Sequence, residues 1–182
     1  QKELPIRELI SRSDHNNYIF RLRDNIRNTS DIHNFSVEKT GLAAHTRSLD
    51  IQGVIPVEKE CCGIEESKNY TASVIDDLIH KYHVDRDSII ILSNRSIDKS
   101  IFSVNKRAGK YNVVTALTSD IDNTVLFRTI NEFKGLESDV VILVLHKGEA
   151  EFADKSRYLS EELLYVGFTR ARHLLYVVTV LP

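Results

Sequence analysis

Two neighbouring stretches near the end of the chain decide the fold: TINEFKGLESDVVILV, from Thr129 to Val144, and EELLYVGFTRARHLLYVV, from Glu161 to Val178. The first places a polar, glycine-containing turn before a continuous apolar run. The second begins with a helical pattern, passes through the charged Thr169–Arg172 segment and continues at once into a β-branched run. Two buried strands that bracket a helix, with charge at the turns, predict a parallel βαβ crossover.

Length and composition indicate a single globular domain. The chain has 182 residues, of which 42% are hydrophobic and 27% charged, and its net charge of −2 provides no general attraction for nucleic acid. Any contact with DNA must therefore be local. No apolar run is long enough to span a bilayer, and no signal-peptide pattern opens the chain, so we predict no membrane partner and a cytoplasmic location.

The remaining segments alternate between strand and helix patterns. Apolar residues recur at helical spacing over 65–82, and a second helix is predicted over 94–105. Thr29 or Ser30 is a suitable N-cap for a further helix. This alternation predicts a three-layer α/β domain with a mostly parallel sheet, whose strands are expected at 18–22, 54–58, 87–93, 111–117, 123–130, 139–145 and 174–180. Pro56 favours an edge position or a strand start for the second of these.

Three blocks together resemble conserved motifs of superfamily 1 DNA helicases of the UvrD/Rep/PcrA kind. Residues 129–144 are similar to motif V, residues 161–178 to motif VI, and the Asn-x-Arg-x-Thr sequence from Asn25 to Thr29 to motif IV. The resemblance implies that residues 18–182 form the second RecA-like domain, without the large insertion of the longer relatives. The P-loop NTPase superfamily fold would then lack its own Walker A loop. Residues 1–17 would be a lead-in from a preceding domain.

The same resemblance implies roles at a nucleotide site. Arg170 matches the arginine finger, and Arg27 matches a second arginine that reaches the same phosphate. An arginine suits this task because its guanidinium is always charged and can bind two phosphate oxygens at once. Glu137 would contact the nucleotide sugar, while Gly135 would permit a tight turn with close backbone approach. Lys134 is either a solvated lysine or a positioning charge for phosphate or DNA.

Four further residues are candidates for contact with DNA. Thr129 ends a predicted strand and could donate its hydroxyl to a phosphate, which suits a motor that moves along any sequence. Asn131 stands where relatives usually carry histidine, so it keeps hydrogen bonding but lacks a ring for stacking. Asn94 and Arg95 resemble a polar turn that faces the nucleic acid track, and a simple helix cap by Ser96 is an equally good interpretation. We assign Arg172 a solvated or structural role.

Missing motifs limit what this chain can do alone. The Gly-Lys pair at Gly109 and Lys110 has no glycine five residues earlier and no Ser or Thr after it, so it is not a Walker A loop. Asp76 and Asp77 follow an apolar pair as in a Walker B strand, but helical periodicity places them on a solvated face. We therefore expect ATP and Mg²⁺ only in a longer protein, with the Mg²⁺ held by an N-terminal RecA-like domain, and no metal site here.

Chain composition supports that expectation. The sequence begins at Gln1 and contains no methionine, which indicates a fragment or missing residues. Adjacent Cys61 and Cys62 are expected to be reduced, because a disulfide between neighbours is strained.

The predicted function is the C-terminal half of an ATP-dependent DNA helicase that binds single-stranded DNA through the DNA backbone. The alternatives are an interaction module derived from a helicase without motor activity, and a motor directed to RNA.

Overall fold

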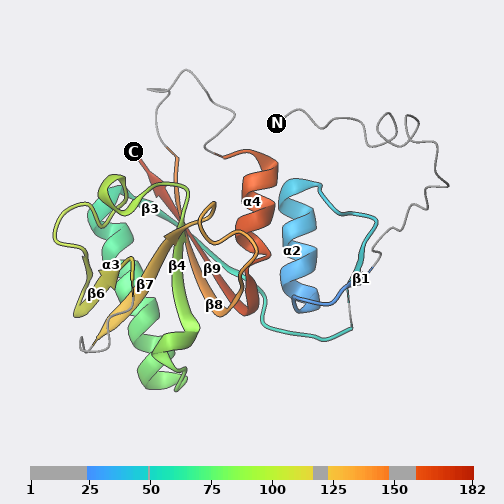
Figure 1. Cartoon of the computed structure of the whole chain (residues 1–182), viewed down its shortest axis with the longest axis horizontal. Helices are drawn as coiled ribbons and strands as arrows, with labels where there is room; N and C mark the ends of the chain where they lie inside the picture. The colour runs from blue at the N-terminus through green and yellow to red at the C-terminus, as the bar shows by residue number, and fades with distance from the viewer. Residues whose placement is uncertain (1–23, 49, 117–122, 148–158) are drawn as a thin grey trace, which may run out of the picture.

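A seven-stranded sheet organises the molecule in the computed structural model, which describes residues 24–48, 50–116, 123–147 and 159–182 (Figure 1). The strand order is β3-β9-β8-β4-β7-β6-β5, and every neighbouring pair is parallel except β5 with β6. The strands are β3 (Val57–Cys62), β4 (Ile89–Ser93), β5 (Arg107–Ala108), β6 (Tyr111–Val114), β7 (Thr124–Thr129), β8 (Ser138–His146) and β9 (Ala171–Leu181). The predicted mostly parallel sheet is confirmed.

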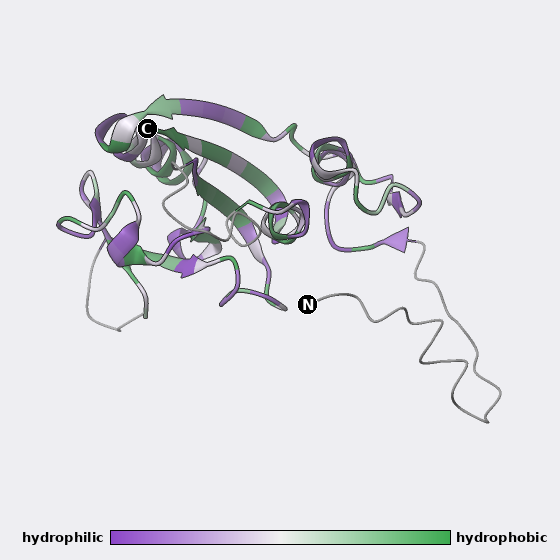
Figure 2. Cartoon of the chain, turned by 90° about the horizontal axis from the view of Figure 1, so that it is seen from above, coloured by the Kyte–Doolittle hydropathy of each residue, from purple (hydrophilic) through white to green (hydrophobic). Residues whose placement is uncertain are grey.

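The central strands are apolar over most of their length because both faces of the sheet are covered. All five residues of β4 are buried, and β8 is buried from Val140 to His146. Alternate residues on these strands therefore enter two different cores. Figure 2 shows the hydrophobic stretches running along the strands in the middle of the sheet. This pattern is typical of parallel strands in α/β proteins and explains why continuous apolar runs predicted them.

Helices cover the sheet on opposite faces (Figure 1). On one face, α3 (Gly63–Asp76) and the π-helical turn that continues it contribute Val74, Ile75 and Leu78 to a core with Ile89 and Ile91 of β4. The other face carries α2 (Ser30–Thr40) and α4 (Glu161–Phe168), whose buried residues pack with Ile90, Leu92, Val141 and Leu143. The ring of Phe35 meets that of Phe168 edge-on at 5.1 Å. The predicted three-layer architecture is confirmed.

Two predicted elements differ from the structure. The helix expected over 94–105 is wrong, because only Ile97–Lys99 forms a single 3₁₀ turn before further turns. Its apolar residues Ile97, Ile101 and Phe102 instead fill the core beside α3 as parts of a loop. The strand expected over 54–58 begins at Val57, directly after Pro56, and lies at the sheet edge as the proline indicated. The strand predicted at 18–22 and the lead-in lie outside the described residues.

Smaller expectations agree with the structure. Thr29 occupies the N-cap position of α2, although its side chain makes no capping hydrogen bond. Cys61 is buried and Cys62 exposed on β3, and both are free. Asp76 and Asp77 lie on the outer side of the α3 region, while Val74 and Ile75 before them are buried. Within the described residues, no helix is both long and apolar enough to cross a membrane.

Candidate functional site

Three turns that are far apart in the sequence meet where β8 and β9 begin. Backbone hydrogen bonds join them: Thr29 N–H donates to the Arg172 carbonyl at 3.4 Å, and Ser138 N–H donates to the Arg170 carbonyl at 3.0 Å. The register pairs Ser138 with Ala171, so the two strands start side by side. The blocks similar to motifs IV, V and VI therefore come together at the amino edge of the sheet.

The turn that carries Arg27 is built by Asn25. Its side-chain carbonyl accepts hydrogen bonds from the backbone N–H groups of Arg27, at 3.0 Å, and Asn28, at 3.4 Å. This is the local geometry by which asparagine side chains close turns. The Asn25 amide also contacts Nδ1 of the buried His33 at 3.0 Å, which ties the turn to α2. The Arg27 side chain is half-exposed on this turn.

Asn28 joins the Arg27 turn to the Arg170 turn, a connection that the sequence analysis missed. The side chain is 4% exposed, and its amide nitrogen donates to the backbone carbonyls of Thr169, at 3.1 Å, and Ala171. Its carbonyl accepts from Asn25 at 3.1 Å. The sequence does show a polar residue, Asn28, between Arg27 and Thr29. Its hydrogen-bond partners lie about 140 positions away in the sequence, so the pattern alone does not identify them.

We expect Asn28→Ala to destabilise the protein by about 1–3 kcal/mol, because it leaves two buried carbonyls without donors. Urea unfolding followed by circular dichroism measures the change. Asn112→Ala is the matched control, since Asn112 is a half-buried asparagine on β6 at the other side of the sheet. Equal stability of Asn28→Ala and the native protein would show that the two turns hold their positions without this side chain.

Arg170 is a buried arginine between α4 and β9. Its Nε donates to the Val166 carbonyl at 3.0 Å, Nη1 to the Leu136 carbonyl at 2.9 Å, and Nη2 to the Thr169 hydroxyl at 3.3 Å. Burial lowers the pKa of Arg170, the charge of Arg27 lowers it further, and Glu137 opposes both. A guanidinium remains protonated at neutral pH even so. Since it has five N–H groups and three are used here, two remain for an anion.

Glu137 is the negative charge within this group. Its Oε2 lies 2.9 Å from Nε of Arg27, and its Oε1 lies 3.8 Å from Nε of Arg172. Arg172 also contacts Asp139, with Nη1 at 3.3 Å from Oδ1. The structure thus brings Arg27, Glu137 and Arg170 together, and it adds Arg172 and Asp139 to them. The solvated or structural role predicted for Arg172 fits its half-exposed side chain but omits these contacts.

Gly135 shapes the turn that precedes Glu137. Its φ of 94° lies in the region that side chains disfavour, so the predicted need for glycine in a tight turn has a backbone cause. A Cβ built at Gly135 would meet no atom of the described chain within 4 Å, so the space beside this turn is open. What glycine provides here is the conformation of the turn.

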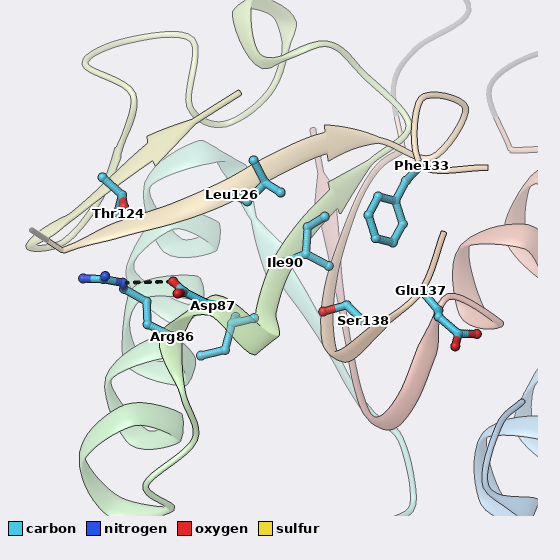
Figure 3. A pocket seen from close by; sticks show the side chains of 9 residues that line it. Arg86, Asp87, Ile90, Thr124, Leu126, Phe133, Glu137 and Ser138 are labelled. Atoms are coloured by element: carbon cyan, nitrogen blue, oxygen red, sulfur yellow. Dashed lines mark ion pairs between the residues drawn. The ribbon is translucent and has the colours of Figure 1, made fainter. Parts of the chain in front are cut away.

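A pocket of about 160 Å³ opens on the other side of Glu137, at the amino ends of β4, β7 and β8 (Figure 3). Ile90, Leu126 and Phe133 point into it, and Arg86 forms an ion pair with Asp87 at its far end, with Nε 3.8 Å from Oδ1. The Glu137 carboxylate points away from these side chains. The centre of the pocket is apolar, and neither Arg27 nor Arg170 lines it.

The residues predicted to contact DNA lie mainly at the opposite edge of the sheet. Ser93 pairs with both Thr129 of β7 and Val144 of β8, so the carboxyl ends of these strands are together. At the strand rise of about 3.3 Å per residue, this edge is roughly 20 Å from the start of β8. Asn94 has a structural task there, since its side chain exchanges hydrogen bonds with the His146 backbone at 3.0 and 3.3 Å.

Thr129 begins a reciprocal cap. Glu132 N–H donates to the Thr129 hydroxyl at 3.2 Å, and Thr129 N–H donates to the Glu132 carboxylate at 2.9 Å. The Thr-x-x-Glu spacing is the sequence signature of a capping box, and it was available before the structure. The hydroxyl accepts in this arrangement, so its own proton is free to be donated to a phosphate. The adjacent carboxylate works against such a contact.

Lys134 and Asn131 face a groove rather than the group formed by Arg27, Glu137 and Arg170. Together with Ser160, Glu162, Leu163 and Val166 they line an open groove of about 460 Å³ between the turn after β7 and the start of α4. The Ser160 hydroxyl caps α4 by accepting from Leu163 N–H at 3.2 Å. Lys134 therefore lines a groove with the candidate DNA contact Asn131, and neither Arg27 nor Arg170 lines it. Glu162 lowers the positive charge of this groove.

His146 ends β8 beside the Asn94 turn and is 7% exposed. Its Nε2 has no hydrogen-bond partner, and burial, with a smaller effect of the Arg95 charge, lowers its pKa from 6.5 to about 4. The imidazole is therefore neutral in the folded protein at pH 7. In the unfolded chain it takes up a proton near pH 6.5.

We expect the free energy of unfolding to fall by up to about 3 kcal/mol between pH 6.5 and pH 4 through His146 alone, because the unfolded chain binds the additional proton in this window. Urea unfolding at several pH values measures the slope. His146→Leu should flatten it, whereas the control His45→Gln, at an exposed position, should keep the native slope. An unchanged slope in His146→Leu would place the acid sensitivity elsewhere.

A resident metal has no evident site in this part of the protein. Across residues 24–48, 50–116, 123–147 and 159–182, no group of three or more His, Cys, Asp or Glu residues is arranged to hold an ion. The charged groups at the amino edge are instead dominated by guanidinium groups. Such groups bind anions with oxygen donors, such as phosphates.

Comparisons with known proteins concern the family and the fold of the chain. Residues 124–178 match the family model of the UvrD-like helicase C-terminal domain. The fold is similar to the crystal structure of the C-terminal domain of a possible DNA helicase from Lactobacillus plantarum WCFS1, with a TM-score of 0.59 and 22% sequence identity over 85% of this chain and 86% of that one. A likeness at this identity establishes the fold. No protein of curated function matches the chain.

Proposed function

We propose that this chain, whose residues 124–178 match the UvrD-like helicase C-terminal domain, is one half of an ATP-dependent DNA motor. It would supply Arg27, Arg170 and Glu137 to a nucleotide held by another RecA-like domain. One observation carries the proposal: two arginines from opposite ends of the sequence meet at one turn. Arg170 Nη1 donates to the Leu136 carbonyl at 2.9 Å, and Arg27 Nε lies 2.9 Å from Oε2 of Glu137, the next residue. The charge of Arg27 also lowers the pKa of Arg170. An anion between them would relieve this repulsion.

The chemistry required of the two arginines is electrostatic. Phosphoryl transfer places negative charge on the γ-phosphate oxygens, and fixed cations stabilise that charge without reorganising. Arg170 is held by three hydrogen bonds from its guanidinium, so it is already oriented. Arg27 is anchored through Nε to Glu137, which leaves its two terminal nitrogens for phosphate oxygens. Because these cations come from this domain, hydrolysis would depend on its closure against the other one.

ATP and Mg²⁺ belong to the other domain in this proposal. The 182-residue sequence contains no Gly-x-x-x-x-Gly-Lys-Ser/Thr loop to cradle phosphates. The N-terminal RecA-like domain would provide that loop and the carboxylates that hold Mg²⁺. Glu137 would bind the hydroxyl groups of the sugar, since a carboxylate is a hydrogen-bond acceptor.

Single-stranded DNA would lie along the carboxyl edge of the sheet. Thr129, Asn131, Lys134 and Arg95 offer hydrogen-bond donors there, and such donors suit phosphate contacts that carry no sequence information. The separation from the arginine cluster supports two sites on one domain, one for nucleotide and one for the strand. Movement of the domain would then link hydrolysis to displacement along DNA.

The proposal is tested by comparing this chain alone with the same chain joined to its ATPase domain. Alone, it should neither bind ATP in equilibrium dialysis nor hydrolyse it. Joined, it should hydrolyse ATP faster when single-stranded DNA is added, and it should unwind a DNA duplex. Activity on a matched RNA duplex only would contradict the DNA assignment. Absence of nucleotide-dependent activity in the joined form would contradict the motor and favour an interaction module derived from a helicase.

A further inference from the structure

Glu137 stands in a row of alternating charges that extends beyond the residues given roles above. The order is Arg27, Glu137, Arg172 and Asp139, with separations of 2.9, 3.8 and 3.3 Å between the charged atoms of successive members. Each member is exposed over between 42% and 49% of its side chain. Exposed pairs of this kind contribute little to stability, so the reason for the arrangement lies elsewhere.

The backbone fixes which charges face one another. Glu137 and Asp139 flank Ser138, the first residue of β8, and Ser138 pairs with Ala171, the residue before Arg172 on β9. An irregularity in the register lies between Ser138 and Val140, at the position of Asp139. Arg172 is thereby placed against both carboxylates. The pairing of β8 with β9 therefore places Arg172 beside Glu137.

The two oxygens of Glu137 are divided between Arg27 and Arg172. Glu137 has two carboxylate oxygens: Oε2 faces Nε of Arg27, and Oε1 faces Nε of Arg172. An arginine beside an isolated carboxylate favours a two-point contact in which a pair of its nitrogens meets both oxygens. Such a contact would engage one of the terminal nitrogens of Arg27 that a phosphate needs. Arg172 stands at the oxygen that this contact would require.

We propose that Arg172, held in place by Asp139, is a positioning residue that prevents Glu137 from capturing the terminal nitrogens of Arg27. This inference rests on the proposed function, because it concerns how Arg27 is kept available for the γ-phosphate. Arg172 does not touch the nucleotide. Asp139 keeps the Arg172 guanidinium beside Glu137 when the nucleotide is absent.

The test measures kcat for DNA-stimulated ATP hydrolysis by the joined protein. Arg172→Ala should lower kcat by about 10- to 100-fold, because Arg27 is displaced from its place at the phosphate. Adding Glu137→Gln to Arg172→Ala should then raise kcat above that of Arg172→Ala alone, since a neutral amide no longer traps Arg27. Arg172→Lys, which keeps a cation beside Oε1, should restore part of kcat. Thermal unfolding should be the same in all these proteins.

Lys106→Ala is the matched control, because Lys106 forms a similar exposed pair with Asp98 at 3.2 Å, at the β5 side of the sheet. It should leave kcat unchanged. A double variant whose kcat is equal to or lower than that of Arg172→Ala would overturn the inference, as would an Arg172→Ala protein with native kcat. Either result could occur while Arg170→Ala still abolishes hydrolysis, so a failure here is distinct from a failure of the proposed function.

Discussion

Arg170→Ala is expected to lower DNA-stimulated ATP hydrolysis by between about 10³- and 10⁵-fold, the range found when an arginine finger is lost. ATP binding should persist, because the other domain holds most of the triphosphate. The reason is that a fixed positive charge is removed from the place where charge accumulates during transfer. Steady-state hydrolysis and binding of a fluorescent ATP analogue, measured on the same protein, separate the two effects.

Structural damage has to be excluded in the same experiment. Arg170 donates to the carbonyl of Leu136, so its loss removes that hydrogen bond and costs about 1–3 kcal/mol of stability. Thermal unfolding shows whether the domain remains folded at the assay temperature. Arg107→Ala is the control, since Arg107 also donates to a backbone carbonyl but lies on β5. Native turnover in a folded Arg170→Ala protein would refute the finger role.

Arg27→Ala should lower hydrolysis by about 10²- to 10³-fold, the loss typical of one donor to a developing oxyanion. In contrast to Arg170, this arginine is half-exposed, and its side chain donates to no backbone carbonyl among the described residues. We therefore expect the melting temperature to stay unchanged. Stopped-flow measurement of a single turnover locates the loss in the chemical step.

Arg27→Lys makes that test more specific. A lysine keeps the charge but has a single nitrogen, so it cannot contact Glu137 and a phosphate through different parts of one planar group. Its activity should fall nearly as far as that of Arg27→Ala. Full activity in Arg27→Lys would mean that a point charge suffices and that the anchored orientation of Arg27 is unimportant.

Much of the fold could be predicted because the strands are buried on both faces. The apolar runs Ile89–Leu92 and Val140–Leu145 occupy the centre of the sheet, where both faces are covered. The passage from α4 into β9 was visible as a change from helical spacing to a β-branched run. In each case one local pattern determines one element.

Other features depend on distant partners and were not predictable in this way. Ile97, Ile101 and Phe102 have a spacing suited to a helix, yet they anchor a loop over the sheet. Asn94 resembles a ligand-facing polar residue, but its amide joins β4 to β8 through the His146 backbone. Asn28 and Arg172 gain their roles from contacts across the sheet edge. Sequence spacing alone contains no information about these pairings.

The central claim is that Arg27 and Arg170 act on a single phosphate held by another domain. The most direct measurement is a crystal structure of the joined protein with ADP, Mg²⁺ and a fluoroaluminate mimic of the transferred phosphoryl group. We predict that guanidinium nitrogens of both arginines lie within about 3 Å of that mimic, with Glu137 at the sugar. A closed complex in which either guanidinium faces away from the mimic would contradict it.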